Sequence, residues 1–305
     1  MYIYKKKGLF FVYERLKIYF FKFLTKNTMK LFFLGGDIIN HSPMTSGYHE
    51  DHIVNLLKYF IANNYNNFLI DIGSNIGLIS CQLGDDFSSI YMYEPNPLCC
   101  QISQINLELS SLSSKVELNN YGLGDADANF SLYIPKHNWG GAFICDQNAY
   151  TLDVAAKKDG FDYFDERNYL FKEISVKNAQ KEFKRIFSNL ESENKRKGVI
   201  KIDVEGYEPT LLDALALTIP QNISCYIVFE SWDPKFDFDK FLSNFQGRAQ
   251  GYVYKRNISS FFLKGKLTKL LYVLFFNEVS YRMVPINNSS NKVGDLVIHV
   301  DKKNA

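Results

Sequence analysis

The sequence predicts an α/β protein with a mostly parallel sheet that is covered by helices on both faces. Between residues 49 and 229, short apolar segments typical of buried strands alternate with longer segments of helical periodicity. One of these strands leads directly into a glycine-containing turn and a helix, the arrangement in which α/β proteins bind nucleotide-like ligands. With 305 residues, the chain is long enough to bury one large core.

The expected elements follow one another in a regular order. Helical patterns occupy about 3–30 and 49–63, and the next segments indicate a strand at 68–72, a helix at 76–84, a strand at 90–94, a helix at 96–110 and a strand at 116–121. Residues 130–134 predict an additional strand, and charged helical sequence fills much of 149–197. A strand at 199–204, a helix at 208–217 and a strand at 223–229 complete the alternation.

The turn after the strand at 68–72 is the strongest candidate for a ligand site. Its sequence from Asp71 to Gly77 is DIGSNIG. Gly73 and Gly77 carry no side chain at points where the backbone must turn tightly and approach a ligand. Asp71 places a negative charge beside the turn, which suits a cationic ligand better than a pyrophosphate. The G-x-x-x-G spacing also differs from the G-x-G-x-x-G fingerprint of dinucleotide sites.

The next strand, at 90–94, ends in an acidic residue. Glu94 lies about 20 residues after the glycine turn and is followed by the sequence PNP. A carboxylate at this position is well placed to accept hydrogen bonds from the hydroxyl groups of a ribose. We therefore expect Glu94 to bind a ribose, with a solvated residue at the end of a strand as the simpler structural alternative.

Three carboxylates gather at the end of the strand at 199–204, namely Asp203, Glu205 and Glu208. In an open α/β sheet, ligands bind at the carboxyl ends of the strands. Like charges this close raise the proton affinity of one another, so that one of them could act as a general base. A favourable interaction with a helix dipole explains Glu208, but it explains Asp203 poorly.

These segments resemble the FkbM family of S-adenosylmethionine (SAM)-dependent methyltransferases. The resemblance runs from about Phe68 to the C-terminus and is carried by the blocks LIDIGSNIGLIS, YEPNP and VIKIDVEGYE, in that order. It implies a Rossmann-like class I methyltransferase fold with a mostly parallel, seven-stranded sheet, whose last two strands correspond to residues 251–254 and 295–300. It further implies SAM as the cofactor and O-methylation, often of a sugar hydroxyl in a polysaccharide, glycolipid or secondary metabolite.

The resemblance also indicates which residues bind the cofactor. Residues 116–126 are similar to the third strand of the family and its Gly-Asp loop, which neighbours the adenine and is Gly124-Asp125 in this chain. The expected cofactor-binding residues are Asp71, Gly73, Ser74, Asn75, Gly77, Glu94, Pro95, Gly124, Asp125 and Asp203.

Methyl transfer to an oxygen requires the acceptor to be held in line with the methyl group and its hydroxyl to lose a proton. Asp203 is the first candidate for the general base and Glu205 the second. Glu230 ends a strand at the same edge and is expected to assist or to bind an acceptor hydroxyl. His137 stands beside a glycine-rich loop, where a surface position explains it equally well. Alternatively, Asp203, Glu205 and Glu230 hold Mg²⁺ through oxygen ligands.

Two departures from the family pattern fall on the expected acceptor side. The family usually carries a Leu-Asp-Asp element shortly before the Lys-Ile-Asp strand, whereas this chain has Val176-Lys177-Asn178-Ala179. Residues 146–197 also form a longer and more charged segment, which we expect to be a helical insertion that serves as an acceptor lid. The expected organisation is a basic, aromatic extension over 1–48 and a methyltransferase domain over 49–305.

Composition limits the remaining function classes. Basic and acidic residues nearly balance, at 35 against 33, so no global nucleic-acid footprint is present. Five cysteines without C-x-x-C spacing indicate reduced thiols in the cytoplasm. The sequence HEDH at 49–52 favours an acidic helix start over a metal site. An inactive SAM-binding assembly partner remains an alternative. A nicotinamide-dependent sugar-nucleotide enzyme is disfavoured by the glycine spacing and the missing Tyr-x-x-x-Lys pair.

The first 33 residues differ from the rest of the chain. They contain eight Lys or Arg residues against the single acid Glu14, interleaved with many Phe and Tyr residues. No segment reaches the roughly 20 apolar residues that span a bilayer. Packing on the core or an oligomer contact is the default interpretation, and peripheral contact of residues 1–30 with the inner face of an anionic membrane is the alternative. A second basic and aromatic segment lies at 261–276.

Overall fold

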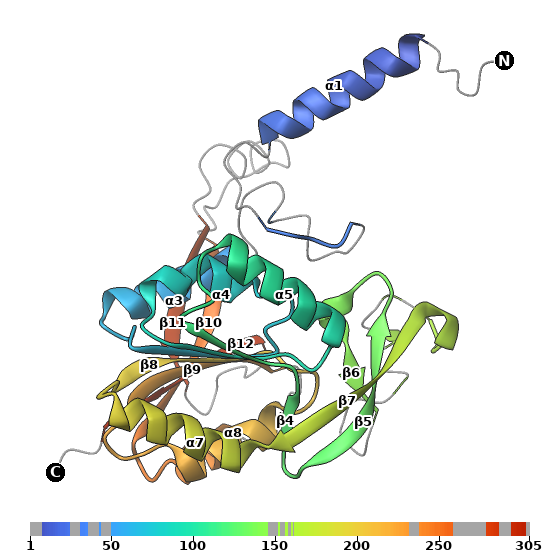
Figure 1. The fold of residues 1–305 in the computed structure, drawn as a ribbon. Coiled ribbons are helices and arrows are strands. Elements are labelled where there is room, and N and C mark those ends of the chain that lie inside the picture. Colours follow the sequence, from blue (N-terminus) through green and yellow to red (C-terminus); the bar gives the residue numbers. More distant parts are fainter. Residues whose placement is uncertain are drawn as a thin grey trace, which may run out of the picture.

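The computed structural model describes residues 8–24, 31–35, 43, 50–145, 152, 156–157, 160, 162–231, 238–258, 279–286 and 294–302. The body has three layers, with a large sheet between two layers of helices (Figure 1). Helices α3 (Asp51–Ala62), α4 (Leu78–Leu83) and α5 (Pro97–Leu109) cover one face. Helices α7 (Ala179–Ser192) and α8 (Glu208–Thr218) cover the other, and α9 (Phe238–Asn244) packs beside α8.

The large sheet has the strand order β11-β10-β12-β9-β8-β1-β2-β3. Its parallel part consists of β1 (Phe68–Ile72), β2 (Ile90–Tyr93), β3 (Val116–Asn119), β8 (Lys197–Ile202) and β9 (Ser224–Ser231). Strands β10 (Ala249–Ile258), β11 (Val279–Pro285) and β12 (Gly294–Val300) pair antiparallel. The predicted Rossmann-like α/β fold is confirmed, but the sheet has eight strands rather than seven. The additional strand is β11, which pairs with β10 and so covers what would otherwise be an open edge.

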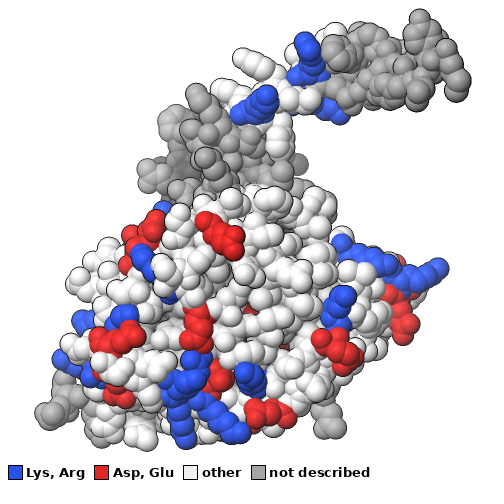
Figure 2. All heavy atoms as spheres, viewed as in Figure 1, with Lys and Arg blue, Asp and Glu red and all other residues white. Residues whose placement is uncertain are grey.

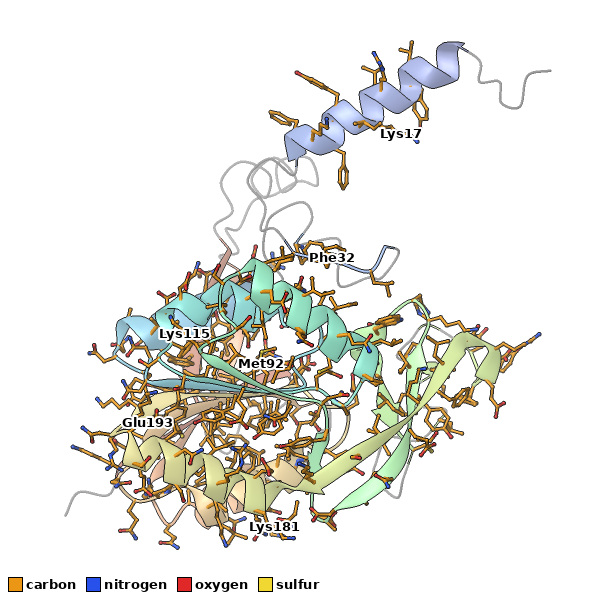
Figure 3. The ribbon with its side chains drawn as sticks, in the orientation of Figure 1. Lys17, Phe32, Met92, Lys115, Lys181 and Glu193 are labelled. Atoms are coloured by element: carbon orange, nitrogen blue, oxygen red, sulfur yellow. The ribbon has the colours of Figure 1, made fainter. Side chains whose placement is uncertain are left out.

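The central strands are apolar throughout because helices cover both of their faces. In β1, Leu69 and Ile70 point to opposite faces, and in β8 Val199 and Ile200 do the same. Figure 3 shows the side chains of both helical layers filling the space against the sheet, with Met92 among those under α5. The core thus consists of one apolar layer on each side of the sheet.

A smaller sheet of β4 (Gly122–Gly124), β5 (Ala128–Pro135), β6 (Phe143–Ile144) and β7 (Tyr169–Asn178) stands at one side of the body, in the order β4-β7-β5-β6 (Figure 1). The helical interpretation of 149–197 is therefore wrong for residues 169–178. In β7, Ile174 and Val176 are buried while Glu173, Ser175 and Lys177 are exposed, which is the period of a half-buried strand. The many charges of this segment belong to its exposed face.

The second half of the expected insertion, α7, belongs to the core of the domain. Its Phe183, Ile186, Phe187 and Leu190 are buried against the large sheet. The departure Val176-Lys177-Asn178 has a local explanation, since Asn178 Oδ1 accepts a hydrogen bond from Lys181 N at 2.9 Å and caps this helix. Residues 146–151, which begin the segment expected to be an acceptor lid, lie outside the described residues.

Helix α1 (Gly8–Leu24) projects away from the body (Figure 1). Every α1 side chain that the structure describes is exposed, so packing on the core does not account for this helix. Within the described part of the chain, no helix is both long and apolar enough to cross a membrane. The second basic and aromatic segment, at 261–276, lies outside the described residues.

Candidate functional site

A cavity of about 290 Å³ opens at the carboxyl ends of β1, β2 and β8, as the parallel arrangement predicts. The turn after β1, the end of β2 and the chain after β8 line it on the side of the large sheet. The small sheet and the 3₁₀ turn η3 (Trp139–Gly141) line it from the opposite side. We call Gly73, Ser74, Asn75 and Glu94 the turn wall, and Glu50, Asp203 and Glu205 the carboxylate wall.

The glycine turn is shaped by its contact with the chain after β8. Gly73 has a φ of 77°, and a Cβ built on it would lie 1.8 Å from the carbonyl oxygen of Asp203. Its N–H and that of Ser74 both donate to the carbonyl oxygen of Tyr93, at 2.9 and 3.1 Å. The expectation that Gly73 makes room for a ligand needs correction, because the space it leaves is filled by the backbone of the protein itself.

Asp71 is completely buried at the start of this turn. Its Oδ2 accepts a hydrogen bond from Ser80 Oγ at 2.7 Å, and Lys201 Nζ lies 4.0 Å from its Oδ1. Burial raises the pKa of Asp71, while Lys201 and Ser80 act in the opposite direction. The negative charge that the sequence offers to a cationic ligand is therefore already shared with a lysine of the protein.

Lys201 is a site residue that the sequence analysis missed. Its side chain is buried in β8 between Ile200 and Ile202, and its Nζ donates to Asp203 Oδ2 at 2.8 Å. Burial opposes its charge, but the carboxylates of Asp203, Asp71 and Glu50 outweigh burial and raise its pKa. A lysine inside a strand that is covered on both faces requires such partners. A single lysine between apolar residues of a predicted buried strand was therefore the signal from which Lys201 could have been identified.

Glu94 holds the backbone of the turn wall in place. Its Oε2 accepts the N–H of Asn75 at 2.7 Å, and its Oε1 accepts the N–H of Asn96 at 2.8 Å. Burial raises the pKa of Glu94 to about 7, and these two hydrogen bonds limit the rise. Each carboxylate oxygen has a further lone pair, so Glu94 can still accept hydrogen bonds from a ligand in the cavity.

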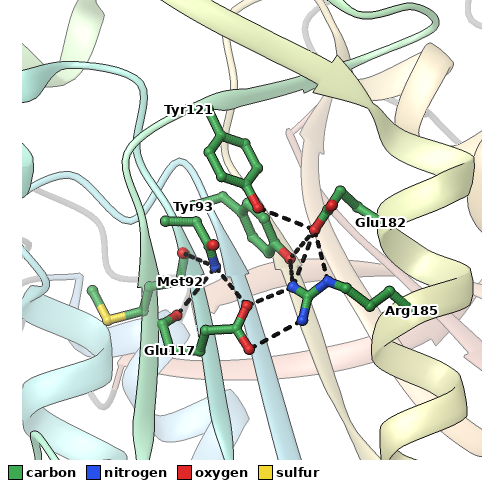
Figure 4. A network of polar contacts seen from close by, with 7 residues as sticks. Met92, Tyr93, Glu117, Tyr121, Glu182 and Arg185 are labelled. Atoms are coloured by element: carbon green, nitrogen blue, oxygen red, sulfur yellow. Dashed lines mark hydrogen bonds and ion pairs between the residues drawn. The ribbon is translucent and has the colours of Figure 1, made fainter.

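A polar network behind Glu94 fixes the ends of β2 and β3 against α7 (Figure 4). The hydroxyl groups of Tyr93 and Tyr121 both donate to Glu182 Oε2, at 3.2 and 3.1 Å. Arg185 forms ion pairs with Glu182 and with Glu117 of β3. Because Tyr93 directly precedes Glu94 and also lines the cavity, the network supports the position of the turn wall.

The carboxylate wall is more open. The side chain of Asp203 is 51% exposed, and Glu205 is partly buried. Glu50, which the sequence analysis took only for part of a helix start, also lines the cavity. Burial raises the pKa of Glu50 to about 7, Lys201 lowers it, and Asp203 raises it further. No sequence motif marks Glu50, because its place depends on how α3 packs on the sheet.

Five of the expected site residues do not line this cavity in the described structure, namely Gly77, Gly124, Asp125, His137 and Glu230. Gly122 and Leu123 of β4 line it in place of the Gly-Asp pair. His137 immediately precedes the loop of η3, which does line the cavity. The remaining expected residues all line the cavity.

Glu230 lies in β9 opposite Asp295 of β12 and does not line the cavity. The described residues contain no group of three or more His, Cys, Asp or Glu side chains that could hold a metal ion. The alternative in which Asp203, Glu205 and Glu230 hold Mg²⁺ is therefore not supported.

The cavity has the chemistry of a site for a polar, positively charged ligand. Its described lining contains five carboxylates (Glu50, Asp71, Glu94, Asp203 and Glu205) and one lysine, Lys201. Two buried polar atoms of residues that line the cavity, Asp71 Oδ1 and Ser74 Oγ, have no hydrogen-bond partner among the described residues. A ligand that donates hydrogen bonds would satisfy them. SAM carries an ammonium, a sulfonium and ribose hydroxyl groups, so the residues present fit it.

One family model and one curated relative match this chain. The family model described as the methyltransferase FkbM domain matches residues 71–254. A curated relative, the methyltransferase sdnD of Sordaria araneosa, is 26% identical over 187 residues, which cover 58% of this chain and 71% of that protein.

Solved structures that match this chain include the precorrin 8W decarboxylase of Methanobacterium thermoautotrophicum, at 9% identity and a TM-score of 0.38. The match covers 82% of this chain and 89% of the other. A precorrin-6y C5,15-methyltransferase of Geobacter metallireducens GS-15 has 10% identity and a TM-score of 0.38, over 84% of this chain and 92% of the other. Similarity of this degree says nothing about the substrate.

Proposed function

The chain belongs to the FkbM methyltransferase family, and on that premise we propose that it transfers a methyl group from SAM to a hydroxyl oxygen. We propose as acceptor a sugar in a surface polysaccharide, a glycolipid or a secondary metabolite. The observation that supports this most strongly is that a single cavity is lined both by the turn wall and by the carboxylate wall. Cofactor and acceptor groups would therefore meet in one place.

The turn wall would hold the cofactor. Glu94 would accept hydrogen bonds from the ribose hydroxyls, because it lines the cavity and each of its oxygens has a lone pair beyond the one that binds the backbone. Ser74 Oγ and Asp71 Oδ1 would gain the partners that they lack in the protein. When bound, SAM supplies a methyl group on a positively charged sulfur, and its transfer to a nucleophile removes that charge.

The carboxylate wall would take the proton of the acceptor hydroxyl. Asp203 is our first candidate because it lines the cavity, is half exposed, and is held by Lys201 through its Oδ2. Glu50 is the competing base, since a pKa of about 7 is close to that of an effective general base near neutral pH. Glu205 is placed to bind another acceptor hydroxyl. The Lys201 ammonium interacts with both Asp71 and Asp203. Asp71 is buried, whereas the more exposed Asp203 is available to an acceptor.

Mass spectrometry of surface glycans and glycolipids tests the acceptor class. Cells with the gene, cells without it, and cells that carry Asp203→Asn are compared. We expect one fraction from the first to be heavier by one CH₂ group and the other two to lack this increase. SAM binding is measured separately on the purified parent protein. If that protein binds SAM but the glycan and glycolipid masses are identical in all three kinds of cell, a glycan acceptor is contradicted while SAM binding stands.

A further inference from the structure

Helix α1 plays no part in the proposed reaction, and it carries an unusual amount of uncovered apolar surface. Eight of its large apolar side chains are between 46% and 77% exposed, namely Val12, Tyr13, Leu16, Ile18, Tyr19, Phe20, Phe21 and Phe23. A helix of a water-soluble body normally buries such a stripe against its neighbours. Contiguous apolar surface of this kind marks a contact with another surface.

Five of these eight apolar side chains share one face of α1, whereas Ile18 and Phe21 lie on the opposite side. Val12, Leu16, Tyr19, Phe20 and Phe23 follow the spacing i, i+4, i+7, i+8 and i+11, which places them on one side of the helix.

The basic residues Arg15, Lys17 and Lys22 lie outside this stripe, against the single acid Glu14. Lys17 Nζ lies over the ring of Tyr13, 4.5 Å from the ring centroid, so a basic and an aromatic side chain of α1 contact each other.

The positive charge of the N-terminal segment indicates what kind of surface α1 contacts. The first 33 residues contain eight basic residues and one acid, whereas basic and acidic side chains are interspersed on the face of the body seen in Figure 2. In that view the charged side chains drawn on α1 are all basic. A second copy of α1 would bring like charges together, which costs free energy in a dry contact. An anionic lipid surface attracts the same charges, and Phe and Tyr rings suit its interfacial layer.

We infer that α1 lies on the surface of a bilayer that contains anionic lipid, with the stripe of Val12, Leu16, Tyr19, Phe20 and Phe23 facing the acyl chains. Because α1 has 17 residues and carries charges along its length, it would lie along the surface. This inference does not depend on the proposed reaction.

The chain that follows α1 is attached beside the turn wall. Phe32 N donates to Asn106 Oδ1 at 2.6 Å, and Asn106 Nδ2 donates to the carbonyl oxygens of Phe32 and Ile76, at 3.2 and 2.9 Å. Leu31 and Phe33 pack against the apolar cluster that contains Ile76. Asn106 thus joins the N-terminal segment to the end of the glycine turn, and binding of α1 to a bilayer would hold the cavity close to the lipid.

Co-sedimentation with vesicles tests this inference on the full chain. Vesicles of phosphatidylcholine alone are compared with vesicles that also contain phosphatidylglycerol, at low and at high salt. We expect binding only to the anionic vesicles, and weaker binding at high salt because salt screens the attraction. Replacement of Arg15, Lys17 and Lys22 by Gln, or Leu16→Gln with Phe20→Gln, should each weaken binding by about tenfold or more.

The matched control replaces three exposed basic residues of the body by Gln, namely Lys172, Lys184 and Lys302. It has the same change in charge and should bind vesicles like the parent. SAM binding, measured on the same preparations, should be equal in all variants, so failure of this inference and failure of the proposed function are distinguishable. Negligible binding of the parent to anionic vesicles, an equal loss in the control, or a dimer that dissociates on Leu16→Gln with Phe20→Gln would each overturn the inference.

Discussion

The two walls of the cavity hold their carboxylates in different ways. Glu94 of the turn wall is buried, and both of its oxygens accept backbone N–H groups. Asp203 of the carboxylate wall is half exposed and is held by the ammonium of Lys201. A side chain that organises the backbone cannot be changed without changing the fold around it. We therefore expect variants of the turn wall to lose stability and cofactor affinity together, and variants of Asp203 and Glu205 to lose turnover with a smaller change in SAM affinity.

Gly73→Ala should have the largest effect on stability. The added Cβ would meet the Asp203 carbonyl oxygen at 1.8 Å, so the turn and the chain after β8 must move apart. We expect the free energy of unfolding to fall by about 3 kcal/mol or more, as measured by chemical denaturation.

Gly247→Ala is the matched control, because Gly247 has the same φ of 77° and no atom within 4 Å of an added Cβ. It should lose only about 1–2 kcal/mol, the cost of the left-handed conformation. Equal losses in the two variants would show that backbone strain, and not contact between the two walls, makes Gly73 necessary.

Asp203→Asn should lower kcat by more than about a hundredfold, because it removes the proposed base. The Kd for SAM should change little, since Asp203 belongs to the other wall. The kcat values of Glu50→Gln and Glu205→Gln, measured in parallel, show which of the three carboxylates is the base. A larger loss in Glu50→Gln than in Asp203→Asn would transfer the role of base to Glu50.

Glu94→Ala should weaken SAM binding by about 1.5–3 kcal/mol, as expected for lost hydrogen bonds to a charged group. It should also lower Tm, because the N–H groups of Asn75 and Asn96 lose their acceptor. Glu117→Ala serves as the control, since Glu117 belongs to the polar network and does not line the cavity. That variant should lower Tm with a smaller loss of SAM affinity than Glu94→Ala. Unchanged SAM affinity in Glu94→Ala would break the assignment of the turn wall.

The smallest expected effect concerns Glu208, at the start of α8. Burial raises its pKa from the ordinary 4.5 to about 8. The folded chain therefore holds this proton more tightly than the unfolded chain, and stability falls as the pH rises from 4.5 to 8. Glu50 and Glu94, with pKa values of about 7, contribute in the same direction.

Glu208→Gln removes this contribution for one group. The variant should be more stable than the parent by about 1–2 kcal/mol near pH 9 and equal to it near pH 4, because only the ionised form is penalised. Urea denaturation at the two pH values measures the difference. A stability difference that is the same at both pH values would mean that the ionisation of Glu208 is not its cause.

The sequence predicted the turn wall better than the carboxylate wall. Glycine spacing and the acidic end of β2 are local signals, and the backbone geometry there depends on them directly. Glu50 and Lys201 belong to the site through packing across the sheet, so no local pattern contains them. Lys201 was recognisable only as a charge between the apolar residues Ile200 and Ile202 of a buried strand.

The same distinction holds for the fold. The central strands were found because they are apolar on both faces, and α4, α5 and α8 because they follow those strands at regular intervals. Strands β7 and β11 were missed. In β11, the apolar residues Val279, Tyr281 and Met283 alternate with Ser280 and Arg282, which is the pattern of an edge strand. In β7 the exposed residues Lys172, Glu173 and Lys177 gave the segment a helical appearance and concealed its period of two.

Calorimetric titration of the purified chain with SAM shows whether the turn wall is a SAM site. We expect SAM and S-adenosylhomocysteine to bind and to raise Tm by mass action, and NAD to do neither. Absence of SAM binding, together with clear binding of NAD, would contradict it.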